Sequence, residues 1–65
     1  MKRNILIIED DVVFGRSMGN WLKKNHMDSV CVTRLSVARK ELLSKEYDLV
    51  LADLRLPDGN STELL

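Results

Sequence analysis

The sequence predicts an α/β protein with a parallel sheet, on the basis of two apolar strands and the helical patterns between them. Ile5–Ile8 and Leu49–Ala52 are continuous apolar runs without polar alternation, which is typical of strands buried on both faces. The order strand, helix, strand, helix, strand favours right-handed crossovers between parallel strands. All 65 residues fit one small domain, which buries only about 60% of the surface of its unfolded chain.

The segment after the first strand has the pattern of a helix with a capped start. Asp11 is suited to the N-cap, and Lys23 and Lys24 fall in the last turn, where the helix dipole favours cations. Asn25 is expected to end the helix in the left-handed conformation. The apolar face, which we expect to be core, has residues at helical spacing: Phe14, Met18, Trp21 and Leu22.

The middle of the chain predicts a second strand and a second helix. Ser29–Thr33 is the expected strand, in which Cys31 is interpreted as a small buried apolar residue. Ser36 is the expected cap of the second helix. The apolar face of that helix is formed by Val37, Ala38, Leu42 and Leu43.

Composition excludes several classes of function. Ten basic and ten acidic residues cancel, so this segment has no electrostatic footprint for nucleic acid or an anionic membrane. One cysteine excludes an internal disulfide framework and fits a reducing cytoplasm. The apolar run after Met1–Arg3 is four residues long, too short for a secretory signal or a membrane span.

Acidic residues follow both apolar strands. Glu9, Asp10 and Asp11 close the first strand, and Asp53 closes the second. Parallel strands end at the same edge of a sheet, so neighbouring strands would bring these carboxylates together. Carboxylates brought that close together cannot all stay ionised without a cation between them. Their joint placement therefore indicates a divalent metal site around a reactive aspartate. Each acidic group taken alone is more simply a solvated turn, and only their joint placement favours the site.

With these acids at the ends of its strands, the chain resembles a two-component response-regulator receiver domain. The resemblance is carried by Ile5–Asp11 and by Asp53–Gly59, which reads Asp-Leu-Arg-Leu-Pro-Asp-Gly. It covers the whole chain, which corresponds to the N-terminal half of the family's domain, with no second domain. The implied fold is the flavodoxin-like parallel sheet, here ending after the third strand with the order 2-1-3.

The resemblance implies a role for each matching residue. Asp53 matches the phosphoacceptor that takes a phosphoryl group from a sensor histidine kinase. Asp10 matches the direct Mg²⁺ ligand, Glu9 its acidic neighbour, and Arg55 the position whose backbone carbonyl completes the site. Asp11 is interpreted as a helix cap or as part of the acidic pocket. The implied function is phosphorelay signalling by a non-enzymatic module, with control of transcription as the expected output.

Three alternatives are weighed against this resemblance. The family's hydroxyl residue after strand four and lysine after strand five have no counterpart here, so the chain is alternatively a phosphorylation-incompetent structural fragment. A phosphatase of the haloacid-dehalogenase type also uses an aspartate nucleophile and Mg²⁺. That type needs a second acid two residues later, where this chain has Arg55. A nucleotide-binding half would need a glycine-rich loop in place of the acids.

The order 2-1-3 also predicts self-association. It leaves the third strand, Leu49–Ala52, as an apolar edge that invites pairing with another chain. We therefore expect a dimer or higher oligomer formed through this strand or its flanking helices.

Overall fold

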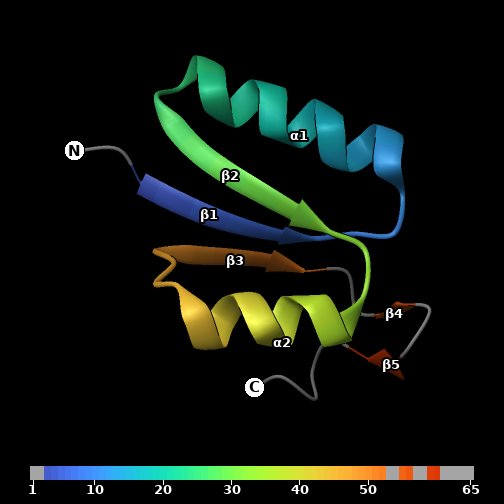
Figure 1. Ribbon diagram of the computed structural model, residues 1–65. Helices are drawn as coiled ribbons and strands as arrows, with labels where there is room; N and C mark the ends of the chain where they lie inside the picture. Colours follow the sequence, from blue (N-terminus) through green and yellow to red (C-terminus); the bar gives the residue numbers. More distant parts are fainter. Residues whose placement is uncertain (1–2, 53–54, 57–58, 61–65) are drawn as a thin grey trace.

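Three parallel strands with one helix on each face form the centre of the protein (Figure 1). The computed structural model describes residues 3–52, 55–56 and 59–60. The sheet has the order β2-β1-β3 and is parallel throughout, which confirms the predicted fold. Its elements are β1 (Arg3–Ile8), α1 (Val12–Lys24), β2 (Met27–Val32), α2 (Leu35–Ser44) and β3 (Leu49–Ala52).

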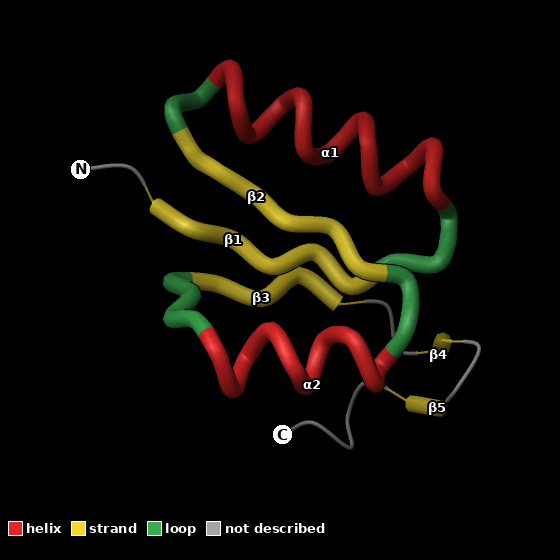
Figure 2. Tube along the Cα trace, viewed as in Figure 1, coloured by secondary structure: helices red, strands yellow, loops and turns green. Residues whose placement is uncertain are grey.

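The central strand β1 supplies the core of both faces. Ile5–Ile8 expose 2% of their surface or less, as the uninterrupted apolar run predicts. Ile5 and Ile7 pack with Leu22 of α1, whereas Leu6 and Ile8 pack with α2 through Leu35 and Ala38. Figure 2 shows the two helices on either side of the three strands. The strand is therefore held between two apolar layers.

The prediction of burial on both faces is wrong for β3. Leu51 is half-buried, but Leu49 exposes 50% of its surface and Val50 38%. The reason is topological, because β3 lies at the edge of the sheet and pairs with β1 on one side. This arrangement matches the expected exposed apolar edge.

Hydrogen bonds at the start of the sheet fix the register of β3 on β1. The Asn4 backbone N–H donates to Asp48 Oδ2 at 2.7 Å, and the Asp48 N–H donates to the Asn4 carbonyl at 2.8 Å. The register then pairs Ile5 with Leu49 and Ile8 with Ala52. Since side chains alternate between faces, a slip of one residue would reverse the apolar set of β3.

A second polar contact ties α2 to the connection that precedes β3. The Tyr47 hydroxyl donates to Glu41 Oε1 at 2.6 Å, and Lys45 Nζ lies 3.4 Å from the same oxygen. Desolvation and this hydrogen bond raise the pKa of Tyr47 to about 12. The hydrogen bond from Tyr47, followed by the contact with Lys45, lowers the pKa of Glu41.

Helix α1 packs against β2 through two glycines. A Cβ atom built on Gly15 would lie 2.6 Å from Cys31 Sγ, and one built on Gly19 would lie 3.2 Å from Ser29 Oγ. The prediction that Cys31 is buried is wrong, since the residue is exposed on the outer strand of the sheet. Its sulfur atom nevertheless fills the space that Gly15 leaves open.

Two predicted helix boundaries are wrong. Asn25 is the C-cap of α1 with φ −101°, and the left-handed residue is instead His26, with φ 62°. Helix α2 has Arg34 as its N-cap without a side-chain hydrogen bond, so Ser36 lies inside the helix. The second strand runs over Met27–Val32, starting two residues before the predicted one. The cap at Asp11 and the basic last turn of α1 are confirmed.

A short hairpin that the sequence analysis did not predict follows β3. The strands β4 (Arg55–Leu56) and β5 (Gly59–Asn60) pair antiparallel, with Leu56 opposite Gly59. Gly59 has φ 148°, a backbone conformation that glycine adopts readily. Within the described residues, no helix is long and apolar enough to cross a membrane.

The contact between Gly15 and Cys31 predicts a sign reversal between two genetic backgrounds. Gly15→Ala alone should lower the free energy of unfolding by about 1 kcal/mol, because overpacking at the sulfur outweighs the gain in helix propensity. In a Cys31→Ala background the new methyl group meets a Cβ at 4.0 Å, so the same change should stabilise the protein by up to about 1 kcal/mol. Urea unfolding followed by circular dichroism measures both effects.

Gly19→Ala is the matched control for this cycle. A Cβ atom on Gly19 would lie 3.2 Å from Ser29 Oγ, so the effect of this substitution should be smaller and independent of Cys31. An equal effect of Gly15→Ala in both backgrounds would contradict the assigned contact.

Candidate functional site

The carboxyl ends of β1 and β3 meet at one edge of the sheet. Ile8 and Ala52 are paired, so the chain leaves both strands at the same level. Glu9 follows β1 directly and is half-buried. Asp53 follows Ala52 in the sequence but lies outside the described residues. The predicted adjacency of strands one and three is confirmed.

The loop that joins β1 to α1 contains the three predicted acids. The Glu9 backbone N–H donates to the Val32 carbonyl of β2 at 2.9 Å. Asp10 is exposed. Asp11 Oδ1 accepts a hydrogen bond from the Phe14 N–H at 3.0 Å, and the Asp11 carbonyl accepts one from the Gly15 N–H at 2.9 Å. Of the two interpretations of Asp11, the structure favours the helix cap.

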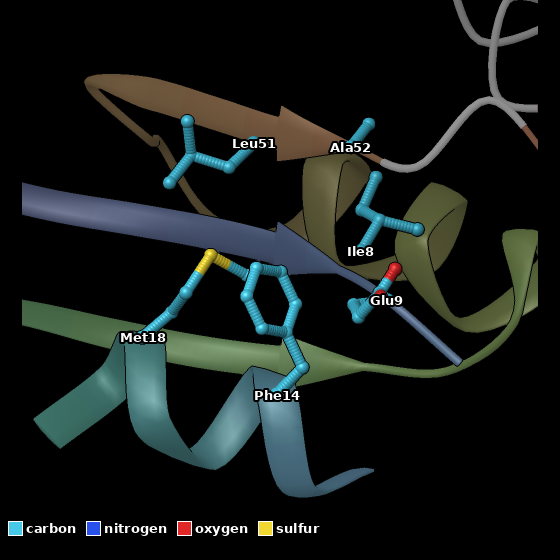
Figure 3. Close-up of a pocket in the computed structure, with 6 residues that line it drawn as sticks. All are labelled: Ile8, Glu9, Phe14, Met18, Leu51 and Ala52. Atoms are coloured by element: carbon cyan, nitrogen blue, oxygen red, sulfur yellow. The ribbon is translucent and has the colours of Figure 1, made fainter. Parts of the chain in front are cut away.

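A hollow of about 400 Å³ opens beside Glu9 (Figure 3). Figure 3 shows Phe14 and Met18 extending from α1 toward β1 and β3. The prediction that Phe14 belongs to the core is wrong, because 52% of its surface is exposed. The residues that line the hollow are Ile8, Glu9, Phe14, Met18, Leu51 and Ala52.

A second hollow, of about 320 Å³, continues along α1 and shares Met18 and Leu51 with the first. Trp21 lines it with 61% of its surface exposed, so its assignment to the core is also wrong. Together the two hollows form what we call the α1–β3 groove, lined by Phe14, Met18, Trp21 and Leu51. The helical spacing of Phe14, Met18 and Trp21 could not distinguish a groove from a core, since both need an apolar stripe.

The Glu9 carboxylate affects the titration of a thiol on the neighbouring strand β2. Desolvation of the thiol by neighbouring atoms raises the pKa of Cys31, and the Glu9 carboxylate raises it further. The one signal of this contact in the sequence is that Glu9 and Cys31 lie close to the carboxyl ends of parallel strands.

The described donors fit a hard cation in their chemistry. Glu9 and Asp10 offer carboxylate oxygens, and Mg²⁺ is commonly bound by one or two carboxylates together with water. Among the described residues, no group of three or more acidic, cysteine or histidine side chains could hold a metal ion. The predicted third carboxylate, that of Asp53, falls outside them. Arg55, whose carbonyl was predicted to complete the site, begins β4.

Fold and site together define a class of protein: a parallel α/β unit with acids at the carboxyl end of its central strand. The family model of the response regulator receiver domain matches residues 5–65. The chain therefore belongs to the response regulator receiver family.

Relatives of known sequence and structure agree with this assignment. The swarming motility regulation protein RssB of Serratia marcescens is 36% identical over 62 residues, which cover 95% of this chain and 28% of RssB. The non-phosphorylated HemR receiver domain of Leptospira biflexa superposes with a TM-score of 0.90 at 35% identity, over 97% of this chain and 51% of that one. The MaeR response regulator bound to beryllium trifluoride gives 0.85 at 38% identity, over 97% and 52%.

The chain thus spans about half the length of these solved structures and less than a third of RssB. A resemblance stated from two short motifs is confirmed by similarity over nearly the whole chain. Family membership favours the receiver over the haloacid-dehalogenase phosphatase, whose second acid is replaced by Arg55.

Proposed function

We propose that the chain is the N-terminal half of a magnesium-dependent phosphoacceptor domain and that Asp53 accepts the phosphoryl group. The observation that carries the proposal is the position of Glu9 and Asp10 at the end of β1, next to the strand that precedes Asp53. Membership of the receiver family supports the direction of transfer, from the phosphohistidine of a sensor kinase.

The proposed reaction is a single displacement at phosphorus. A carboxylate oxygen of Asp53 forms the new P–O bond as the P–N bond to the kinase histidine breaks, and the histidine takes up a proton. Glu9, Asp10, Asp53 and the Arg55 carbonyl would hold Mg²⁺. When bound, this ion supplies neutralisation of charge on the transferring oxygens. The beryllium trifluoride complex of MaeR is consistent with such a site.

The proposed role is that of a signalling module and not an enzyme in its own right. The acyl phosphate would change the charge of the site and bias a surface that a partner reads. We propose a cytoplasmic location and control of transcription as the output, without contact to nucleic acid or membrane through this segment.

Magnesium titration followed by backbone-amide NMR tests the metal site. The amides of residues 9–11 should shift on titration, and Asp10→Asn should weaken the affinity by at least about tenfold because a direct carboxylate ligand is lost. Asp28→Asn is the matched control, since this exposed aspartate lies near the opposite end of β2. Equal affinities of both variants would contradict the assigned ligands.

Addition of beryllofluoride with Mg²⁺ then tests the acceptor. The parent chain should show a second set of shifts that Asp53→Ala abolishes. Magnesium binding without any response to beryllofluoride would instead favour the alternative, a phosphorylation-incompetent structural fragment. Turnover of phosphate esters would favour the phosphatase.

We also propose that the chain self-associates through β3. The four residues of its edge are all apolar, and Leu49 and Val50 are exposed. The opposite edge of the sheet, β2, carries the exposed Asp28. A charge on an edge strand discourages pairing, whereas an apolar edge invites it.

Light scattering at tens of micromolar should therefore give a mass above that of the monomer. Val50→Lys should shift the distribution toward monomer, because a charge is placed on the pairing edge. Leu43→Lys is the control, since Leu43 lies on α2 and already exposes 83% of its surface. A monodisperse monomer for the parent chain would refute the proposal.

A further inference from the structure

Asp11 stabilises the start of α1 with both its side chain and its backbone. Its Oδ1 accepts from the Phe14 N–H at 3.0 Å, and its carbonyl accepts from the Gly15 N–H at 2.9 Å. Its φ of −79° and ψ of 102° are those of an N-cap residue outside the helix. Asp11, the last residue of the acidic loop (residues 9–11), is thus attached to α1.

The first residue of the acidic loop is attached to the sheet. The Glu9 N–H donates to the Val32 carbonyl at the end of β2, at 2.9 Å. Asp10, with an exposed side chain, lies between these two attachments. One residue on each side of Asp10 is therefore held by a hydrogen bond to a different element.

We propose that Asp11 is a positioning residue for Mg²⁺, which holds the backbone of Asp10 in its binding conformation through the cap on Phe14 and does not itself ligate the ion. The inference rests on the proposed metal site. Mg²⁺ requires near-octahedral geometry, so the affinity depends on how well the loop is held before binding. Loss of the side-chain cap would leave only the Asp11 carbonyl bond to Gly15 between the loop and the first turn of α1.

Three substitutions of Asp11 separate the cap from the charge. Asp11→Asn and Asp11→Ser both remove the charge and keep a capping oxygen, whereas Asp11→Ala removes both. The Asn variant is therefore the reference against which the Ala variant is compared. Tyr47→Phe is a control for general destabilisation, because it removes the hydrogen bond to Glu41 of α2.

The first measurement is the NMR signal of the Phe14 amide, which reports the cap without any metal. Asn and Ser should keep its protection from hydrogen exchange, and Ala should lose it. The second is magnesium affinity by titration. We expect Asn and Ser to agree within about twofold and Ala to bind about fivefold more weakly than Asn, the size of a typical cap effect. Tyr47→Phe should leave the affinity unchanged.

Three results would overturn the inference. Equal magnesium affinity of the Ala and Asn variants, with the Phe14 amide exposed only in Ala, would show that the cap has no effect on the metal site. Loss of affinity in Asn as large as that of Asp10→Asn would make Asp11 a ligand. An equally weakened Tyr47→Phe would reduce the effect to stability. If the parent chain did not bind Mg²⁺, the proposed metal site itself would fail, while the Phe14 signal would still report the cap.

Discussion

The burial of β1 between two helices is the constraint on which the rest of the structure depends. Four consecutive apolar residues, Ile5–Ile8, leave no face of this strand for water, so it must have covering elements on both faces. Parallel neighbours on both sides then need crossover connections, which α1 and α2 supply. The 2-1-3 order and the two helix layers follow from the position of this one strand.

The same constraint determines where the acids lie. Since β1 is central, the residue after it lies next to the ends of both other strands, and Ile8 pairs with Val32 on one side and with Ala52 on the other. Glu9 is attached to β2 by its backbone, and Asp11 begins α1. The geometry of a candidate metal site is thereby linked to the packing of the core.

Sequence patterns predicted the elements more reliably than the environment of single residues. The cap at Asp11 and the basic last turn of α1 follow from local chemistry, whereas the strand order was implied by the family resemblance; all three are confirmed. The left-handed residue was assigned to Asn25 but is His26, because the helix ends with hydrogen bonds to the carbonyls of residues 22 and 23. Ser36 has capping chemistry, yet packing of the buried Leu35 moves the helix start two residues earlier, to an N-cap at Arg34. Propensity cannot resolve such shifts, because packing decides them.

The exposed apolar surfaces of β3 and α1 have the same explanation, which is that each has the pattern of an element covered on one further side. The apolar run of β3 fits a strand with neighbours on both sides, and the stripe of Phe14 and Trp21 on α1 fits a helix with a covered flank. Both surfaces border the α1–β3 groove, since Leu51 and Met18 line it from the two elements. The β2 edge differs, because Asp28 makes it compatible with water. One edge of the sheet thus carries a charge and the other is apolar, which is why the proposed self-association involves β3 and not β2.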